Sequence, residues 1–474
     1  MRHFDLCIIG SGPAGTRAAI QAAKLGKKVV VVEKAEAVGG AAINTGTIPS
    51  KALREAILGM TRVKNTPVVP RIADFVAAGE RSTFQDLRSS CHRVIREEIE
   101  LAIEHLTSNG VEIVHGMGKF IEPGRVEISG PVNRTTVTAD NFLIAVGTSP
   151  ARPDNVPFTN PSVITSDEIM DLPELPRTML IVGGGVIGTE YASMMSALGV
   201  KVTLVEGRNR LLDFVDEEIT EALQYHLRQG GMTLRLGEKV VSIELGDTPE
   251  FGRSIDGKMA IATLESGKTL KADCLLYCIG RQGSTANLGL DVIGVEADKR
   301  GRIGVNEHYQ TSKPNVYAAG DVIGFPALAS TSMEQGRIAA CHMFGKTVRQ
   351  AAELLPYGVY SVPEISMVGW TEQKLTEEGI PYEAGVANYR EIARGQLLGD
   401  EIGMLKLLIH QETRHVLGVH AIGTGATELI HIGQAAIAFN ATVDYFIDTV
   451  FNYPTLAECY KVAAYNAVNK LMVV

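Results

Sequence analysis

The sequence is poor in cysteine, and its cysteines form no recognisable motif. Among 474 residues there are six, and no two of them have the CxxC spacing of a redox or zinc site. They stand at Cys7, Cys91, Cys274, Cys278, Cys341 and Cys459. Two of them lie in the apolar run DCLLYCIG, which is typical of small buried residues in a strand. We therefore expect no CxxC centre and no metal site.

Long apolar runs and an excess of basic residues are also lacking. No run approaches the ~18 residues that span a bilayer, and the opening MRHFDLCIIG leads directly into a strand pattern. The net charge is −9, and hydrophobic and charged residues make up an ordinary 45% and 21%. We expect a cytoplasmic protein without membrane or nucleic-acid partners. Its length suggests roughly three domains.

What the chain does contain is an internal repeat. The segments from Phe4 to Glu33 and from Thr178 to Glu206 share one order of apolar strand, glycine turn, small-residue helix, apolar strand and terminal glutamate. A single GxGxxG is a weak signal, but here each copy stands between a strand and a helix, with an acidic residue about 20 positions further on. The pattern predicts two dinucleotide-binding βαβ units.

The terminal glutamates indicate which ribose each unit takes. Glu33 would accept hydrogen bonds from an adenosine ribose, and Glu206 favours NAD(H) because a carboxylate repels a 2′-phosphate. Arg208 and Arg210 follow closely, and a short loop shift could bring a guanidinium toward a phosphate. The alternative for both arginines is that they are solvated surface charges.

Between the two units lies GGAAINTGTIPSKAL, Gly39 to Leu53. We expect a glycine-rich loop that enters a helix and approaches a flat or anionic ligand. The stretch has no Cys, His, Asp or Glu.

Further along, we expect a helix from Glu217 to Gln229 and a buried strand that ends at Gly280. The segment NVYAAGDVIG predicts a strand that ends at Gly320-Asp321, followed by a helix to about Phe344. Beyond Lys346 strands such as SVPEISMVGW, GMLKLLIH and VLGVHAIG alternate with amphipathic helices, an α+β pattern.

Taken together, these motifs resemble the pyridine nucleotide-disulfide oxidoreductases over essentially the whole chain. The resemblance implies an α/β fold with two Rossmann-like domains, for FAD and NAD(P), and a C-terminal α+β dimerisation domain. It implies residues 1–150 and 280–348 as two parts of the FAD-binding domain, 151–279 as the NAD(P)-binding domain and 349–474 as the interface domain.

The resemblance also implies roles for particular side chains. Lys51 matches the lysine beside flavin N5, Glu190 its acidic partner, and Asp321 the aspartate that holds the ribityl chain. A cation near N5 stabilises the reduced flavin, and a carboxylate keeps that lysine placed and charged. We predict Lys51, Glu190, Tyr453 and Glu458 as catalytic residues. The predicted cofactor-binding residues are Gly10, Gly12, Pro13, Ala14, Gly15, Glu33, Lys34, Gly40, Thr47, Lys51, Gly118, Ala145, Gly147, Gly183, Gly185, Val186, Ile187, Gly188, Glu206, Gly280, Arg281, Gly320, Asp321, Ala327, Leu328 and Ala329.

Two departures from the family pattern bear on the reaction. The redox disulfide would need cysteines at Ala42 and Thr47, and the family's acid–base histidine is replaced by Tyr453 in FNYPTLAE. A phenol with an ordinary pKa of about 10 is a poor substitute for histidine. Disulfide reduction is therefore excluded. The chain is similar instead to the soluble pyridine nucleotide transhydrogenases, which carry Thr in GTIPSKAL and Tyr in FNYPT, although those commonly keep a cysteine at the position of Ala42.

We predict an enzyme that transfers hydride between pyridine nucleotides, NAD(H) and NADP(H), through flavin N5 by a ping-pong cycle. The alternatives are an NADH-dependent diaphorase or quinone reductase, which Glu206 favours, and a degenerate flavoprotein without activity. The resemblance further implies a homodimer in which Tyr453, Pro454 and Glu458 reach the partner's flavin site, with Tyr453-Pro454 as a candidate cis peptide.

Overall fold

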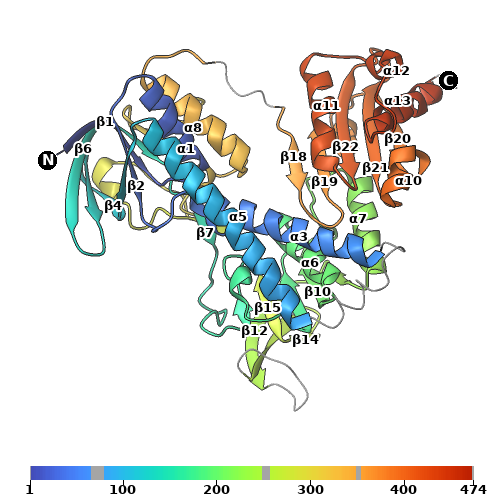
Figure 1. Ribbon diagram of the computed structural model, residues 1–474, viewed down its shortest axis with the longest axis horizontal. Coiled ribbons are helices and arrows are strands. Elements are labelled where there is room, and N and C mark those ends of the chain that lie inside the picture. Colours follow the sequence, from blue (N-terminus) through green and yellow to red (C-terminus); the bar gives the residue numbers. More distant parts are fainter. Residues whose placement is uncertain (1, 66–79, 248–256, 349–353, 472–474) are drawn as a thin grey trace.

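The computed structural model describes residues 2–65, 80–247, 257–348 and 354–471. In these ranges the chain forms three large sheets with helices packed on them (Figure 1). Two sheets are mainly or wholly parallel and the third is antiparallel, which confirms the predicted α/β fold with an α+β C-terminal part. The predicted division into four domain segments stays a prediction, and its last boundary, at 349, lies outside the described residues.

The first sheet has the order β3-β2-β1-β6-β5-β4, and β17 pairs with β6. Its parallel strands are β1 (Arg2–Ile9), β2 (Val29–Glu33), β3 (Glu112–His115), β6 (Arg134–Ile144) and β17 (Val316–Ala318), and its antiparallel strands are β4 (Met117–Glu122) and β5 (Arg125–Ser129). Helices α1 (Pro13–Lys24) and α8 (Ala329–Met343) cross so closely that a Cβ on Gly336 would lie 2.1 Å from the Ala14 carbonyl oxygen. The late segment around β17 and α8 thus completes the fold that the first βαβ unit begins.

The second sheet has the order β11-β10-β9-β15-β8, with all strands parallel. It contains β8 (Val163–Ile164), β9 (Thr178–Val182), β10 (Lys201–Glu206), β11 (Thr233–Leu236) and β15 (Cys274–Tyr277), with helices α6 (Val186–Ala197) and α7 (Glu217–Gln229). Helix α7 has the bounds predicted from the sequence. Two smaller antiparallel groups adjoin it: β12 (Val240–Asp247), β13 (Lys258–Leu264) and β14 (Thr269–Ala272), and the pair β7 (Thr148–Pro150) and β16 (Arg281–Gly283).

The stretch from Gly39 to Leu53 is more helical than predicted. Instead of a loop there is a short helix, α2 (Gly40–Asn44), and α3 (Thr47–Asn65) begins two residues before the proline. Pro49 is tolerated as the third residue of α3 because the first N–H groups of a helix have no intrahelical partner. Helix α3 packs against the long helix α5 (Glu80–Ser108), as Figure 1 shows in two shades of blue.

The third sheet has the order β18-β19-β22-β21-β20 and is antiparallel. Its strands are β18 (Tyr357–Val359), β19 (Ile365–Gly369), β20 (Tyr382–Asn388), β21 (Met404–His410) and β22 (Val416–Ile422), and its helices are α9 (Glu372–Glu377), α10 (Ala393–Leu398), α11 (Ala426–Ala438), α12 (Asp444–Asp448) and α13 (Glu458–Leu471). The strand predicted from Ser361 begins only at Ile365, because the Ser361 carbonyl and the Val362 N–H bond to the side chains of Arg54 and Ser193 instead of a neighbouring strand. Short 3-10 turns complete the described elements: η1 (Ile169–Asp171), η2 (Asp291–Ile293), η3 (Asp321–Ile323) and η4 (Tyr389–Glu391).

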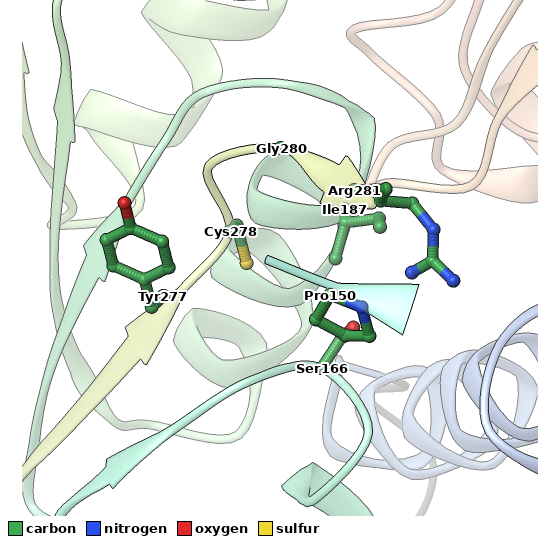
Figure 2. Close-up of a pocket in the computed structure, with 7 residues that line it drawn as sticks. All are labelled: Pro150, Ser166, Ile187, Tyr277, Cys278, Gly280 and Arg281. Carbon is green, nitrogen blue, oxygen red and sulfur yellow. The ribbon is translucent and has the colours of Figure 1, made fainter. Parts of the chain in front are cut away.

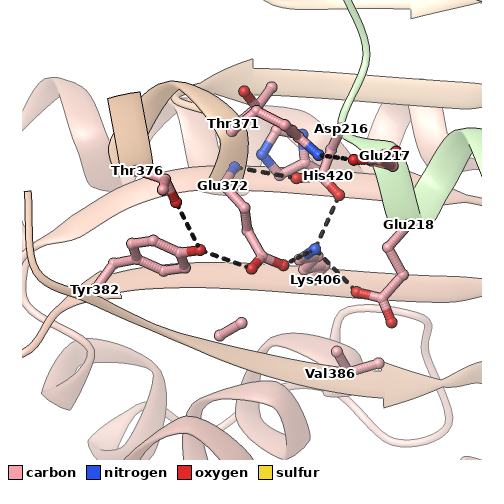
Figure 3. Close-up of polar contacts among 12 residues, drawn as sticks. Asp216, Glu217, Glu218, Thr371, Glu372, Thr376, Tyr382, Val386, Lys406 and His420 are labelled. Atoms are coloured by element: carbon pink, nitrogen blue, oxygen red, sulfur yellow. Dashed lines mark hydrogen bonds and ion pairs between the residues drawn. The ribbon is translucent and has the colours of Figure 1, made fainter. Parts of the chain in front are cut away.

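A buried lysine joins the second sheet's domain to the third. Lys406 of β21 is 1% exposed, and its Nζ lies 2.8 Å from Asp216 Oδ1 and 2.9 Å from Glu218 Oε2, and also contacts Glu372 (Figure 3). The three carboxylates are close enough to hold a cation, and the ammonium group takes that position. Because Asp216 is the N-cap residue of α7 and Lys406 lies in β21, this ion pair fixes the two domains against each other.

Lys406→Met should therefore destabilise the junction by about 3–5 kcal/mol, because it leaves the buried Asp216 carboxylate without its cation. Trp370, the single tryptophan of the sequence, accepts a hydrogen bond from buried His420 at this junction, so urea unfolding can be followed by its fluorescence. Lys374→Met is the matched control: this exposed lysine pairs with Glu378 at 2.7 Å and should matter little.

The destabilisation caused by Lys406→Met should depend on pH. Burial would raise the pKa of Asp216, but His420, Lys406 and a backbone N–H outweigh it and hold that pKa below its usual value. The stabilisation is thus present at neutral pH and lost as the pH falls below about 4. Equal losses in both variants, or a difference that persists in acid, would contradict this account.

Candidate functional site

The first glycine turn connects β1 to α1, and its outer glycines have no room for a side chain. Gly10 has φ +105°, and a Cβ on it would lie 2.3 Å from the Ala145 carbonyl oxygen. A Cβ on Gly15 would lie 2.0 Å from the Gly10 carbonyl oxygen. A larger residue would be strained by the positive φ at Gly10 and would clash with a carbonyl oxygen at either position. These glycines therefore allow the tight turn and the close approach of helix to strand.

The second turn, from β9 to α6, repeats this geometry. Gly183 has φ +110°, and Cβ atoms on Gly183 and Gly188 would lie 3.0 Å from the Cys278 carbonyl oxygen and 1.9 Å from the Gly183 carbonyl oxygen. The sequence repeat is therefore a structural repeat at atomic level.

The middle glycine of each turn differs from the outer two, because it borders open space. A Cβ on Gly12 would approach only Gly40, at 4.0 Å, and one on Gly185 would meet nothing within 4 Å. Each of these residues is the N-cap of a helix and has no side-chain cap. The uncapped N–H groups and the helix dipole suit a phosphate group, so both turns fit the pyrophosphate of a dinucleotide.

Several other predicted residues gather around the first turn. A Cβ on Gly320, where φ is +82°, would lie 3.3 Å from the Ala14 Cβ, and the Gly320 N–H donates to Gln335. Asp321 accepts a hydrogen bond from Thr148 at 3.3 Å, and Arg281 donates to the same threonine hydroxyl at 2.7 Å. A chain of contacts thus runs from β16 through β7 to the start of η3.

The predicted pair of Lys51 and Glu190 lies where three parts of the chain meet. Lys51 Nζ, on α3, is 2.8 Å from Glu190 Oε2 on α6. The other Glu190 oxygen accepts the Tyr360 N–H at 2.8 Å, and the Tyr360 ring lies 4.7 Å from Lys51 Nζ. Glu190 is 4% exposed, whereas the Lys51 side chain keeps 24% of its surface. A buried carboxylate and an aromatic face therefore hold an ammonium group that remains accessible on one side.

A small hollow adjoins the second turn. It has a volume of about 100 Å³ and is bordered by residues that Figure 2 shows as sticks: Pro150, Ser166, Ile187, Tyr277, Cys278, Gly280 and Arg281. Pockets for whole drug-sized ligands measure ~300–1,000 Å³, so this one suits only part of a dinucleotide. Three predicted residues, Ile187, Gly280 and Arg281, meet here.

The terminal glutamates of the two units are both buried and both bonded to their own turn. Glu33 accepts the Ser11 N–H and hydroxyl and the Ala35 N–H. Glu206 accepts the Gly184 N–H and is paired with Arg208. Burial would raise the pKa of Glu206, but the hydrogen bonds from Arg208 and Gly184 outweigh it and lower that pKa, so the carboxylate is ionised at neutral pH.

The remaining predicted residues lie at the margins of these turns. Lys34 and Thr47 are exposed, and Ala327, Leu328 and Ala329 precede or begin α8. Pro13 begins α1 and Val186 begins α6, Gly118 faces Ile9 and Val32, and Gly147 accepts the Ser284 N–H.

The C-terminal candidates belong to the domain of the third sheet, whose strands β20 and β21 pack against α13. Tyr453 is 74% exposed, and Glu458 begins α13 with its Oε2 atom buried and without a hydrogen-bond partner among the described residues. The Tyr453-Pro454 peptide bond is cis, as predicted.

Reasoning from the sequence missed Tyr360, Thr148 and Asp167. Burial raises the pKa of Asp167, against the opposing charge of Arg281, and its carboxylate interacts with Thr45 in the stretch from Gly39 to Leu53. None of the three belongs to one of the glycine fingerprints, and each reaches the site from another part of the chain, so no local pattern indicates them.

Two dinucleotide turns, together with the ion pair of Lys51 and Glu190 between α3 and α6, define an oxidoreductase with two dinucleotide sites. The chain belongs to the pyridine nucleotide-disulphide oxidoreductase family: the family model matches residues 4–336, and that of the family's dimerisation domain matches residues 355–464. The predicted resemblance is thereby confirmed. None of the described helices is long and apolar enough to cross a membrane.

Relatives cover the chain almost completely. It is 48% identical to soluble pyridine nucleotide transhydrogenases of Mycobacterium bovis and Mycobacterium tuberculosis, over 99% of this chain and 98% of theirs. It is 43% identical to the transhydrogenase of Marinomonas, over 99% of both chains. Among solved structures it resembles an HOCl-induced flavoprotein disulfide reductase of Escherichia coli, with 26% identity and a TM-score of 0.86 over 98% of this chain and 99% of that one. LpdA from Mycobacterium tuberculosis is similar too, with 25% identity and a TM-score of 0.85 over 98% and 99%.

Proposed function

We propose that this protein is an FAD-dependent oxidoreductase that transfers hydride between two pyridine nucleotides. The observation on which this depends is the presence of two dinucleotide turns and of the Lys51–Glu190 ion pair, in a chain that has Ala42 and Thr47 where a redox disulfide would stand. The full-length relatives named soluble pyridine nucleotide transhydrogenase support it.

The first turn fits FAD, because Gly10 and Gly15 set the tight turn, Gly12 leaves open space for a pyrophosphate at the start of α1, and Glu33 can accept ribose hydroxyls. Bound there, FAD would supply the centre that accepts hydride from one nucleotide and returns it to another. Lys51 would place a positive charge beside that centre. Glu190 and Tyr360 keep the ammonium group in position.

The second turn would hold both nucleotides in succession. Gly185 leaves room for the pyrophosphate at the start of α6, and Arg281 and Ile187 border the hollow beside it. One site that serves two substrates requires the first product to leave before the second substrate binds. A cytoplasmic location, where such nucleotides would be met, stays a prediction.

Steady-state kinetics should therefore be ping-pong, with NADPH as donor and an NAD⁺ analogue as acceptor. The same preparation should show no long-wavelength thiolate–flavin band when NADH is added without oxygen, because the two motif positions carry Ala42 and Thr47 and no cysteine. If NADH reduces the flavin but NADPH does not, the protein is an NADH diaphorase instead. A purified protein that stays colourless when given FAD would mean a degenerate flavoprotein.

Replacing Lys51 tests the role of its charge. Lys51→Met should make the bound flavin harder to reduce, with a more negative midpoint potential and a rate of reduction by NADH roughly 100-fold lower. Lys51→Arg keeps a cation and should lose less. Lys24→Met, at an exposed lysine of α1, is the control. Unchanged potential in Lys51→Met with FAD still bound would show that the charge does not act on the flavin.

We further propose a homodimer in which the C-terminal motif reaches the partner's flavin site. The exposed Tyr453 and the buried Glu458 oxygen, which has no hydrogen-bond partner in the described part of the chain, suit a surface that a second chain covers. Val450, 91% exposed, and Phe439, 85% exposed, add apolar surface in the same domain. Sedimentation at micromolar concentration should give twice the mass of the chain, and a monomeric profile would contradict the proposal.

A further inference from the structure

The terminal glutamates of the two βαβ units are bound by different kinds of donor. Glu33 is bound by uncharged groups: the Ser11 N–H at 2.9 Å, the Ser11 hydroxyl at 2.6 Å and the Ala35 N–H at 2.9 Å. Glu206 is bound by the Gly184 N–H at 2.6 Å and by Arg208 three times, through its N–H at 2.9 Å and through Nε and Nη2 at 3.0 Å each. The repeat is thus broken at one point, by one guanidinium group.

Arg208 occupies the hydrogen-bonding capacity of Glu206. A carboxylate has about four acceptor positions, and the four bonds above use them. The hydroxyls of an NAD(H) ribose could therefore bond to Glu206 only if the guanidinium moves away. Conversely, while it stays, the carboxylate is neutralised and presents no bare negative charge to a 2′-phosphate.

The backbone of Arg208 is held by hydrogen bonds, whereas its side chain is partly exposed and can rotate. Its N–H is bonded to Glu206 and its carbonyl accepts the Gly237 N–H at 2.8 Å. The side chain is 44% exposed, and its Nη1 atom also pairs with Asp213, whose side chain is 48% exposed. A rotation of the side chain can thus release Glu206 and leave the guanidinium beside Asp213 or in solvent.

We propose that Arg208 allows one site to accept both nucleotides, by pairing with Glu206 and the 2′-phosphate when NADP(H) binds and by leaving Glu206 free for the ribose hydroxyls when NAD(H) binds. This inference rests on the proposed transhydrogenase function and identifies the residue that would make it possible. Guanidinium suits this role because its planar fork binds carboxylate and phosphate alike.

Neighbouring Arg210 provides a matched control. Its Nη2 atom donates to the Asp213 carbonyl at 2.9 Å, and its Nη1 atom lies 3.5 Å from Glu217. It has the same charge, two residues away, but its contacts are with other groups than Glu206. A general effect of positive charge would appear in both variants, whereas the proposed exchange of partners would appear only at Arg208.

The test is calorimetric binding of ADP-ribose and of 2′-phospho-ADP-ribose to the oxidised holoenzyme, which requires no turnover. Arg208→Ala should weaken binding of the phosphorylated ligand ~10–100-fold, the range for a lost charged hydrogen bond, and should leave ADP-ribose as tight or tighter. Arg210→Ala should change both ligands little and equally. Glu206→Gln should weaken ADP-ribose and leave the phosphorylated ligand as tight or tighter.

The possible outcomes separate this inference from the proposed function. If the wild-type protein binds both ligands and Arg208→Ala weakens both equally, or neither, the inference is wrong and the transhydrogenase proposal stands. The inference is also wrong if Arg210→Ala weakens the phosphorylated ligand as selectively as Arg208→Ala does. If the wild-type protein binds only ADP-ribose, both proposals fail.

Discussion

The rest of the site depends on the two hydrogen bonds that the Glu190 carboxylate accepts. One oxygen accepts a hydrogen bond from Lys51 on α3 and the other from the Tyr360 backbone N–H, which follows β18. Glu190 itself lies on α6 of the second dinucleotide unit. Because a buried carboxylate is stable only when charges and hydrogen bonds compensate its lost hydration, its two partners are held at fixed positions. The three parts of the chain can then meet in one arrangement only.

The same junction contains a second set of bonds that reinforces the first. Arg54, one turn after Lys51, donates to the Ser361 carbonyl and pairs with buried Glu364 at 3.1 Å. Ser193, three residues after Glu190, donates its hydroxyl to the Glu190 carbonyl and accepts the Val362 N–H. Helix α6 is thus bonded to the segment before β19 through Glu190 and Ser193, and helix α3 through Arg54. The start of α3, which contains Lys51, is therefore held by ion pairs and hydrogen bonds of its own side chains, in a chain without cysteines at positions 42 and 47.

The fold was largely predictable, and the reason lies in local stereochemistry. Gly10 and Gly183 adopt a positive φ. Gly15 and Gly188 lie so close to a carbonyl oxygen that a Cβ on either residue would be only about 2 Å from it. Such requirements leave a visible glycine pattern, so both βαβ units could be read from the chain. The helix that replaces the predicted loop at Gly40 was missed because glycine and proline weaken the helical signal, although both are allowed in a first turn.

The sequence by itself determined the two dinucleotide units, the absence of a redox disulfide and the motifs that contain Lys51 and Glu190. Each of these features depends on residues close together in the chain. Only the tertiary structure decided that Tyr360 covers Lys51 and that Lys406 lies buried against Asp216, since these residues are far apart in sequence and no local pattern relates them. It also decided that Arg208 folds back onto Glu206 when it could have pointed into solvent, because that choice depends on the position of the Gly184 turn and of Asp213 around the carboxylate.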